Sequence, residues 1–174
     1  MNDPDIDTLA RTLWGEARGE GVAGMEAIAH VVLNRKAVAD QEGGYWWGST
    51  IEDVCKHPFQ YTCWNSNDTN RGKLARLLPT DRVFSQALEI AADAVDGVFV
   101  SDPTNGATHY LNPSGVNILP KWARGKPLAI IGKHHFFRPP EVPALRRPDI
   151  AITATPPAFR LSSVLGKFMH LFKT

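Results

Sequence analysis

The feature that most constrains the fold is an apolar stripe at helical spacing near the start of the chain. Its members stand at i, i+3, i+4, i+7 and i+11, and they are Ile6, Leu9, Ala10, Leu13 and Ala17. Residues at this spacing share one face of an amphipathic α-helix. We expect Asp5 or Asp7 to cap the start of this helix, where acidic side chains also suit the positive end of the helix dipole. Gly19 and Gly21 then end the helix.

The same periodicity predicts two further helices. One runs from about Ala23 to Lys36, and the other runs from about Asp81 to Asp96, after Pro79-Thr80 and before Gly97. The core face of the first consists of Met25, Ile28, Ala29, Val32 and Leu33. The buried face of the second consists of Val83, Phe84, Ala87, Leu88, Ala91 and Val95.

The segments between these helices carry loop and turn signals. Residues 40–49 form a glycine-containing loop, and residues 57–72 are irregular and rich in aromatic side chains and asparagine. Thr50 followed by Asp53 resembles a capping box that opens a short helix, although aspartate is not the preferred third residue.

After Gly97 the chain becomes rich in turns, and short strands are expected there. Residues 108–111 are one candidate strand, and residues 128–131 and 134–137 are a candidate strand pair around Gly132. The predicted fold class is therefore mainly α (α+β), with a small β-hairpin beside the helices.

The composition changes at Pro139. Residues 139–174 contain six prolines and carry five basic against two acidic side chains, which is typical of an extended linker. Within this tail, the pattern of residues 162–173 predicts a basic amphipathic helix whose apolar face would consist of Val164, Leu165, Phe168, Leu171 and Phe172. We predict one folded domain at 1–138 and a tail at 139–174. The tail helix would contact an anionic membrane, or dock on its own domain or on a partner protein.

The overall composition excludes some classes of function. The net charge is +1 and no long basic run occurs, so no nucleic acid partner is expected. A chain of 174 residues, 43% of them hydrophobic, can fold without a metal or a disulfide framework. Cys55 and Cys63 could form a disulfide outside the cytosol, or stay as two reduced, buried thiols.

Glu16 stands where the apolar stripe ends. It lies three residues after Leu13 and seven after Leu9, so on a helix the three side chains share one side. Apolar surroundings disfavour the charged form of a carboxyl group. A general acid that protonates the leaving oxygen of a glycosidic bond needs such surroundings. Glu20 follows one turn later. A solvated glutamate at a helix end would produce the same pattern.

Six segments between about residues 6 and 138 match the motifs of a known protein family, and they occur in the same order. They are LARTLWGEARGE at 9–20, AIAHVVLNR at 27–35, PFQYTCW at 58–64, ATHYLNP at 107–113, PKWA at 120–123 and IGKHHFF at 131–137. Together they resemble the SleB-like cell-wall hydrolase family, which includes spore-cortex-lytic enzymes and phage relatives. Each segment is weak evidence, but the ordered set is specific. The tail after Pro139 lies outside the resemblance.

The resemblance implies a mostly α, lysozyme-like catalytic domain at 1–138, related to goose-type lysozymes and lytic transglycosylases. It implies cleavage of peptidoglycan between N-acetylmuramic acid and N-acetylglucosamine, with Glu16 at the position of the catalytic acid and with no cofactor or metal. A lytic transglycosylase needs only one carboxylate, because the 6-hydroxyl of muramic acid closes an anhydro ring. If Glu20 or another acid positions water instead, the product has a hydrolysed reducing end.

A cleft for sugars also needs flat apolar faces and planar hydrogen-bonding groups. The candidate substrate-binding residues are Glu20, Phe59, Gln60, Tyr61, His109, Tyr110, Asn112 and Trp122. Some of these aromatic side chains could instead belong to the core. His109 could orient Glu16 or bind a sugar hydroxyl, or be a partly buried histidine without such a role.

Other functions stay open at this point. His109, His134 and His135, with the two cysteines, would suit a zinc peptidase or amidase, but no His-Glu-x-x-His or Cys-x-x-Cys spacing occurs. Cys55 or Cys63 with His109 would suit a Cys-His wall peptidase. A non-catalytic wall-binding or tail-structural protein that retains the fold is a further alternative.

The N-terminus is polar and acidic, and no apolar stretch approaches the length of a membrane span. From the sequence we therefore expect no secretory signal. With the resemblance, this predicts a protein that is made in the cytoplasm and acts in the periplasm or cell wall. It would get there after holin-type release, as an endolysin does, or as part of a phage-like particle.

Overall fold

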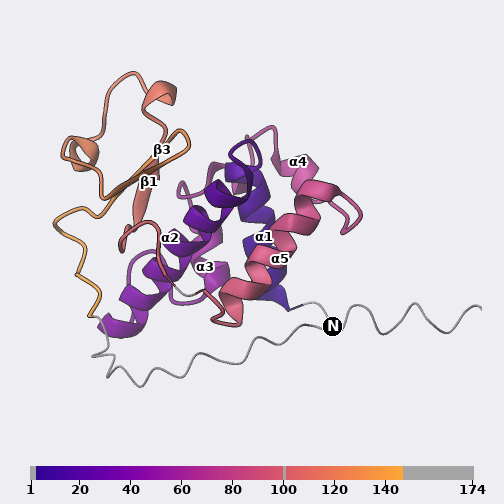
Figure 1. The fold of residues 1–174 in the computed structure, drawn as a ribbon, viewed down its shortest axis with the longest axis horizontal. Coiled ribbons are helices and arrows are strands. Elements are labelled where there is room, and N and C mark those ends of the chain that lie inside the picture. Colours follow the sequence, from indigo (N-terminus) through magenta and orange to yellow (C-terminus); the bar gives the residue numbers. More distant parts are fainter. Residues whose placement is uncertain (1–2, 100, 147–174) are drawn as a thin grey trace, which may run out of the picture.

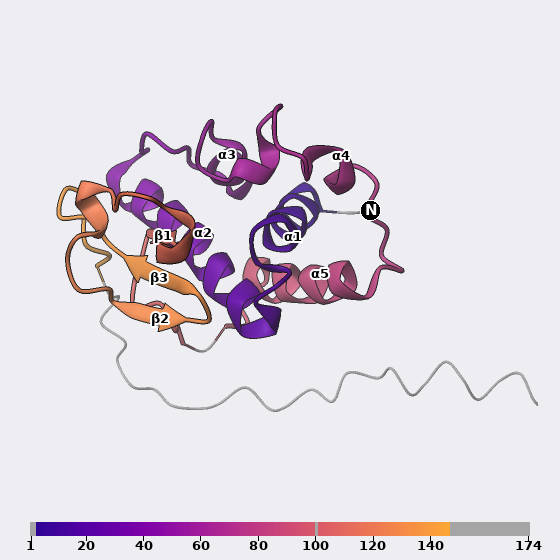
Figure 2. The same ribbon diagram turned by 90° about the horizontal axis from the view of Figure 1, so that it is seen from above.

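The long helices bury the faces that their apolar periodicity predicts. The computed structural model describes residues 3–99 and 101–146 of the chain (Figure 1). Helix α1 (Pro4–Ala17) packs against α2 (Gly21–Glu42), α3 (Ile51–Lys56) and α5 (Arg82–Val95). Figure 2 shows α1 between α3 and α5, with α2 separating it from the sheet. Helix α1 is therefore the central helix of the domain.

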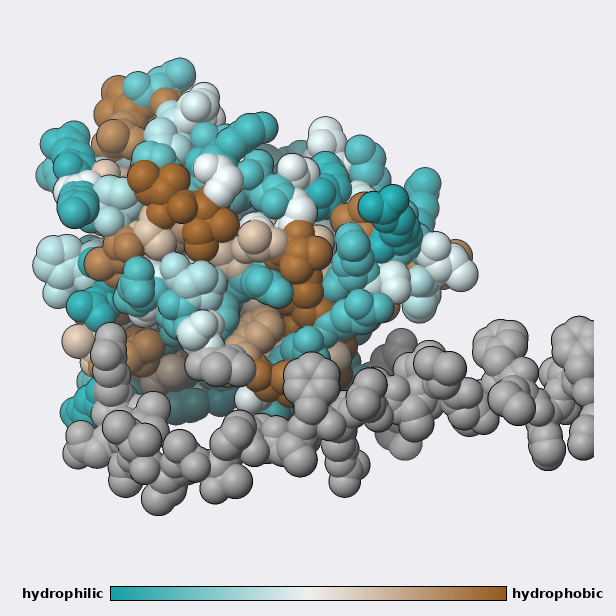
Figure 3. All heavy atoms as spheres, in the orientation of Figure 1, coloured by the Kyte–Doolittle hydropathy of each residue, from teal (hydrophilic) through white to brown (hydrophobic). Residues whose placement is uncertain are grey.

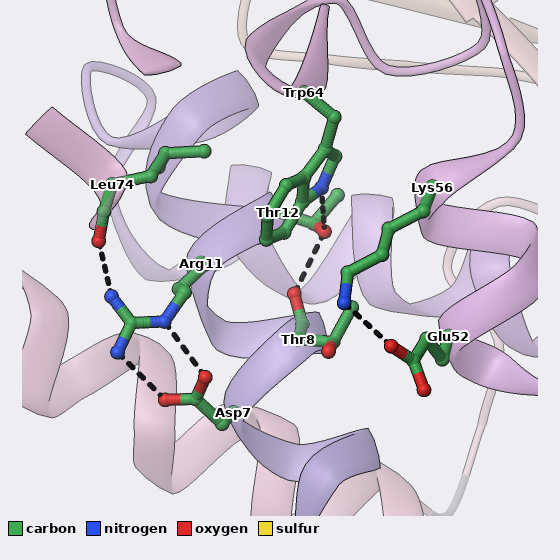
Figure 4. Close-up of polar contacts among 8 residues, drawn as sticks. All are labelled: Asp7, Thr8, Arg11, Thr12, Glu52, Lys56, Trp64 and Leu74. Carbon is green, nitrogen blue, oxygen red and sulfur yellow. Dashed lines mark hydrogen bonds and ion pairs between the residues drawn. The ribbon is translucent and has the colours of Figure 1, made fainter. Parts of the chain in front are cut away.

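The start of α1 differs from the prediction. Asp3 caps the helix, because its side chain accepts a hydrogen bond from Asp5 N at 2.9 Å and Pro4 occupies the first helical turn. Asp7 lies inside the helix and pairs with Arg11 at 2.7 Å. Arg11 also donates to the carbonyl oxygen of Leu74, which ties α1 to α4 (Arg71–Leu74; Figure 4). The prediction of Asp5 or Asp7 as the cap was wrong because both residues belong to the first turn.

Helix α2 is longer than the sequence pattern indicated. It continues to Glu42 and ends at Gly43, which adopts a left-handed conformation. Residues beyond the predicted end at Lys36 continue the buried face, since Val38 and Ala39 are both buried. The helix also buries polar residues, because one side faces α1 and α5 and another faces the sheet (Figure 2).

The short helices are held by local hydrogen bonds. The predicted capping box is confirmed: Thr50 Oγ1 accepts from Asp53 N at 3.0 Å, and Asp53 accepts from Thr50 N at 3.2 Å. The segment after α3 contains the 3₁₀ turn η1 (Thr62–Trp64). Trp64 Nε1 donates to Thr12 Oγ1 at 2.9 Å, which fastens this segment to α1 (Figure 4).

The predicted β-hairpin is present, and a further strand joins it. Strands β2 (Ala129–Ile131) and β3 (His134–Phe137) are antiparallel, and β1 (His109–Leu111) pairs with the other edge of β3. In the described residues the sheet order is β1-β3-β2. The turns η2 (Pro113–Gly115) and η3 (Lys121–Ala123) lie between β1 and β2.

Buried polar side chains of α2 attach the segment that leads into β1. Asn34 Nδ2 donates to Asp102 Oδ2 and to the carbonyl oxygen of Ala107, each at 2.9 Å. Arg35 Nε donates to the carbonyl oxygen of Thr108 at 2.7 Å. Asp102 also accepts from Gly106 N at 2.7 Å. These contacts determine where β1 begins relative to the helices.

The packed chain continues past residue 138. Val142 is buried in the main core, and Gln41 exchanges hydrogen bonds with the backbone of Ala144 and Arg146 at 3.1 and 2.8 Å. The start of the segment that the sequence assigns to a linker therefore packs on α2. The predicted tail helix at 162–173 lies outside the described residues.

Exposed apolar side chains gather beside the sheet. They are Val116, Ile118, Leu119, Leu128 and Ile130. Figure 3 shows hydrophobic residues at the upper left, over the loops that join β1 to β2 in Figure 1. Within residues 3–99 and 101–146, no helix combines the length and the apolar character that a membrane span requires.

We predict that Asn34→Ala lowers the free energy of unfolding by about 2–3 kcal/mol, because it removes the hydrogen bonds to Asp102, Thr104 and Ala107 and leaves these acceptors without this donor. Urea denaturation measures this change. Lys36→Ala is the control on the same helix, since it removes only an exposed ion pair with Asp40 and should cost less than about 1 kcal/mol. Equal losses in the two variants would contradict the assigned role of Asn34.

Candidate functional site

Glu16 is held by two elements that are distant in the sequence. It is the penultimate residue of α1. Its Oε1 accepts a hydrogen bond from Cys63 N of η1 at 3.2 Å, and its Oε2 accepts from the hydroxyl of Tyr110 on β1 at 3.0 Å. The carboxyl group therefore has a defined orientation where α1, η1 and the sheet meet.

The glycine before Glu16 allows this close approach. A Cβ atom at Gly15 would lie 2.6 Å from Cys63 Cβ and 2.7 Å from its Sγ, which is closer than van der Waals contact permits. Without a side chain at this position, η1 packs directly on α1. The backbone N–H of Cys63 then reaches Glu16.

Tyr110 is a persistent donor to this carboxyl group. Its burial, and then the negative charge of Glu16, raise the pKa of Tyr110 well above its usual range. The hydroxyl therefore stays protonated at neutral pH. The Tyr110 ring contacts two rings of β3, with its centroid 5.2 Å from that of His134 and 5.9 Å from that of Phe136. The sheet thus holds both the backbone and the phenol ring of Tyr110 in place.

Glu16 lies where two hollows in the surface meet. The small hollow, of about 320 Å³, is lined by residues that include Glu16, Glu20, Asn112 and His134. The large hollow, of about 570 Å³, is lined by residues that include Glu16, Phe59, Gln60, His109, Tyr110 and Trp122. A chain-like ligand that crossed from one hollow to the other would pass Glu16.

Tyr61 is the exception among the candidate binding residues. Only 1% of it is exposed, and its ring packs below Tyr110 and against the guanidinium group of Arg35. Phe59, two residues earlier, has a positive φ of 64° and is 84% exposed. This turn directs Phe59 outward and Tyr61 into the core, so the prediction that Tyr61 lines the cleft was wrong.

Glu20 lines the small hollow but is committed to a structural contact. Its Oε2 accepts a hydrogen bond from Lys133 N at 3.0 Å, in the turn between β2 and β3. Gly132 in this turn has a positive φ of 57°, which favours glycine, and a Cβ atom there would press on the same oxygen of Glu20. The carboxylate of Glu20 therefore fastens the hairpin to the junction of α1 and α2.

His109 lines the large hollow as a neutral side chain. Burial, and then the nearby charge of Arg35, lower the pKa of His109 to about 4. Its Nδ1 lies 3.0 Å from Thr108 Oγ1, and its ring packs on Trp122 with centroids 5.2 Å apart. Tyr110, and not His109, makes the hydrogen bond that orients Glu16.

The structure adds residues to the site that sequence reasoning missed. Arg35 and Trp46 line the large hollow, and His134 lines the small one. Arg35 is 4% exposed, and its guanidinium carbon lies 5.4 Å from the ring centroids of both Trp47 and Tyr61. A charged residue inside the buried face of α2 was the signal that could have identified it. Among the described residues, Arg35 Nη1 has no hydrogen-bond partner.

Both cysteines are buried free thiols, so the disulfide that the sequence permitted is not formed. The Cys63 side chain packs against Gly15, whereas Cys55 is fully buried in the main core. Burial raises the pKa of Cys55 to about 12 and raises that of Cys63 as well. A cysteine nucleophile requires a lowered thiol pKa, so these thiols are unsuited to a Cys-His peptidase.

The described part of the chain contains no candidate metal site that could support the alternative of a zinc peptidase or amidase. There, no group of three or more histidine, cysteine, aspartate or glutamate side chains is arranged to hold a metal ion.

Known proteins match the chain over most of the described region. A family model described as cell wall hydrolase matches residues 19–137, a range that begins three residues after Glu16. The spore cortex-lytic enzyme of Bacillus subtilis (strain 168) is 31% identical over 138 residues, which cover 78% of this chain and 38% of the relative. The spore cortex-lytic enzyme of Oceanobacillus iheyensis is 33% identical over 134 residues, which cover 77% of this chain and 41% of the relative. The chain thus spans less than half the length of these relatives.

Solved structures are similar over nearly their whole length. The catalytic domain of the germination-specific lytic transglycosylase SleB from Bacillus anthracis has a TM-score of 0.57 and 29% identity, covering 79% of this chain and 97% of that one. The catalytic domain of the Bacillus cereus SleB protein has a TM-score of 0.56 and 30% identity, covering 77% of this chain and 89% of that one. The mainly helical fold with a small sheet, predicted from the sequence, is confirmed.

We predict that His109→Gln flattens the loss of stability between pH 7 and pH 4.5. A histidine in the unfolded chain takes up a proton near pH 6.5, whereas folded His109 does so only near pH 4. The unfolded state therefore binds more protons in this interval, and the wild-type protein loses stability as the pH falls through it. The difference corresponds to at most about 3 kcal/mol before solvent screening reduces it. Urea denaturation at several pH values measures the slope, and equal slopes in the two proteins would contradict the prediction.

Proposed function

The chain belongs to the cell wall hydrolase family, and from this we propose that it cleaves the glycan strands of peptidoglycan with Glu16 as the catalytic acid. The bond is the β-1,4 linkage between N-acetylmuramic acid and N-acetylglucosamine. The observation that carries the proposal is the position of Glu16 at the junction of two hollows, with its carboxyl group held by Tyr110 and by Cys63 N.

The hydrogen bonds to Glu16 leave it able to transfer a proton. A carboxylate offers about four lone-pair positions, and Cys63 N and Tyr110 use one on each oxygen. The remaining positions are free to hold the proton that passes to the glycosidic oxygen as the C1–O bond breaks. A strand lying through both hollows places this bond beside Glu16.

A lytic transglycosylase mechanism fits the acids of this site. After the first proton transfer, the Glu16 carboxylate accepts the proton of the sugar's own 6-hydroxyl while that oxygen bonds to C1. The product is a 1,6-anhydro sugar, and no water is consumed. The contact of Glu20 Oε2 with Lys133 N supports this choice, because it turns this carboxyl group toward the β2–β3 turn, whereas both oxygens of Glu16 are held at the junction of the two hollows.

The other residues of the hollows suit sugar binding. Phe59 and Trp122 offer apolar ring faces in the large hollow, where Gln60 and neutral His109 offer hydrogen-bonding groups. In the small hollow, Asn112 accepts from Ser114 N through its oxygen, which leaves its amide NH₂ available as a donor.

Wider aspects of the role stay predictions from the sequence. Phage-type lysis or wall penetration is one such prediction, and the matched relatives are spore cortex-lytic enzymes. Membrane contact or protein docking through residues 162–173 is another, and that segment lies outside the described residues. The division into a catalytic domain and a tail is a third, for which the contacts of Ala144 and Arg146 with Gln41 support a boundary after residue 146.

We predict that Glu16→Gln lowers the rate at which purified peptidoglycan suspensions lose turbidity by about 10²- to 10⁴-fold, because the amide cannot donate the catalytic proton. Circular dichroism should show an unchanged fold. Glu89→Gln is the matched control, since Glu89 is exposed on α5 and should leave the rate unchanged. Equal, measurable lysis by the wild type and Glu16→Gln would refute the catalytic role of Glu16. No lysis by either protein would favour a non-catalytic wall-binding protein.

We also predict that the released muropeptides end in 1,6-anhydromuramic acid. Mass spectrometry separates this product from a hydrolysed reducing end, because the two differ by one water. Hydrolysed ends as the main product would overturn the transglycosylase mechanism while leaving Glu16 as the acid. In that event Glu20→Gln would show whether Glu20 positions the water.

A further inference from the structure

A third hollow shares a lining residue with the large hollow and none with the small hollow. We call it the outer hollow; its volume is about 490 Å³, and its lining includes Tyr45, Trp46, Glu52, Asp53, Lys56 and His57. None of these residues contacts Glu16 through a hydrogen bond given above. The catalytic proposal therefore leaves the outer hollow without a role.

The outer hollow continues the path that passes Glu16. Trp46 lines both the outer and the large hollow, just as Glu16 lines both the large and the small hollow. One short stretch of chain also borders both, because His57 and Pro58 line the outer hollow and Phe59 and Gln60 line the large one. The three hollows therefore follow one another, with Glu16 at the first junction and Trp46 at the second.

Trp46 provides a flat apolar surface at the second junction. It is 53% exposed, whereas its neighbour Trp47 is fully buried. The two ring centroids are 5.2 Å apart, and Trp47 Nε1 donates to the carbonyl oxygen of Arg35 at 2.9 Å. His57 packs edge to face with Trp46 at 5.3 Å. The exposed indole is thus supported by buried Trp47 and by partly buried His57, which reduces the entropy lost when a ligand binds.

The charges of the outer hollow favour a neutral ligand that carries hydroxyl groups. Lys56 is already paired with Glu52 at 2.6 Å (Figure 4). The hydrogen bonds that Asp53 accepts from Thr50 lower the pKa of Asp53, so it is ionised at neutral pH. Carboxylates accept hydrogen bonds from sugar hydroxyls. Because Lys56 neutralises Glu52, the charge of Asp53 remains and disfavours ligands that are themselves anionic.

We propose that the outer hollow binds a further sugar of the same glycan strand, stacked on Trp46 and hydrogen-bonded to Glu52 or Asp53. This inference rests on the proposed cleavage of glycan strands. It makes the enzyme selective for long strands, because a short strand can fill the small and large hollows without entering the outer hollow beyond Trp46.

The test uses glycan strands freed of their peptides, in a short and a long size class. The readout is kcat/KM for long strands divided by kcat/KM for short strands. We expect Trp46→Ala to lower this ratio about tenfold, the loss expected for one aromatic stacking contact. Trp46→Phe retains a ring face and should restore most of the ratio. Leu78→Ala is the control, since Leu78 is a large apolar residue, 63% exposed, that lines none of the three hollows.

Each outcome decides a separate question. An unchanged ratio in Trp46→Ala, with normal cleavage, overturns the outer hollow as a sugar site and leaves the proposed function intact. A ratio that falls only for strands still bearing peptides overturns the sugar assignment in favour of a peptide. If the wild type cleaves neither strand, the proposed function fails. Calorimetry with long peptide-free strands then tests the outer hollow by itself: weaker binding by Trp46→Ala supports the sugar site, and equal binding overturns it.

Discussion

The hydrogen bonds from the buried face of α2 to residues 102–108 determine where the sheet lies against the helices. Asn34 and Arg35 reach the backbone of Ala107 and Thr108, which directly precede β1. A buried polar group without a hydrogen-bond partner raises the free energy of the folded state. The fold therefore strongly favours this placement of the strand over alternatives that would leave these groups unpaired. Because Tyr110 follows two residues after Thr108, the same contacts bring its hydroxyl to Glu16.

The site is therefore assembled from three separate sources. Helix α1 supplies Glu16 at its end, η1 supplies a backbone N–H, and β1 supplies a phenol. Gly15 permits the approach of η1, and Gly132 permits the contact between Glu20 and the β2–β3 turn. Each contact spans a long stretch of sequence, so the carboxyl group has its working orientation only in the folded domain. The row of hollows along this junction suits a linear polymer better than a compact ligand.

Much of the local structure followed from the sequence, and the errors have identifiable causes. Helical periodicity located α1 and α5, and the Thr50–Asp53 capping box located α3. The predicted end of α2 was too early, because its later turns face both the helices and the sheet and lose a one-sided pattern. Tyr61 was placed in the cleft because aromatic residues serve cores and binding surfaces equally well. Only the turn at Phe59 decides which of the two rings faces solvent.

The sequence by itself determined the helical segments, the hairpin and the family, and it singled out Glu16, at the end of an apolar stripe, as the candidate acid. These features depend on spacing within a few residues or on short motifs. The tertiary structure alone decided that Tyr110 orients Glu16, that Glu20 is held by Lys133 N, and that Trp46 joins two hollows. The physical reason is that these contacts join residues far apart in the chain, and their geometry depends on how α2 packs against both the helices and the sheet.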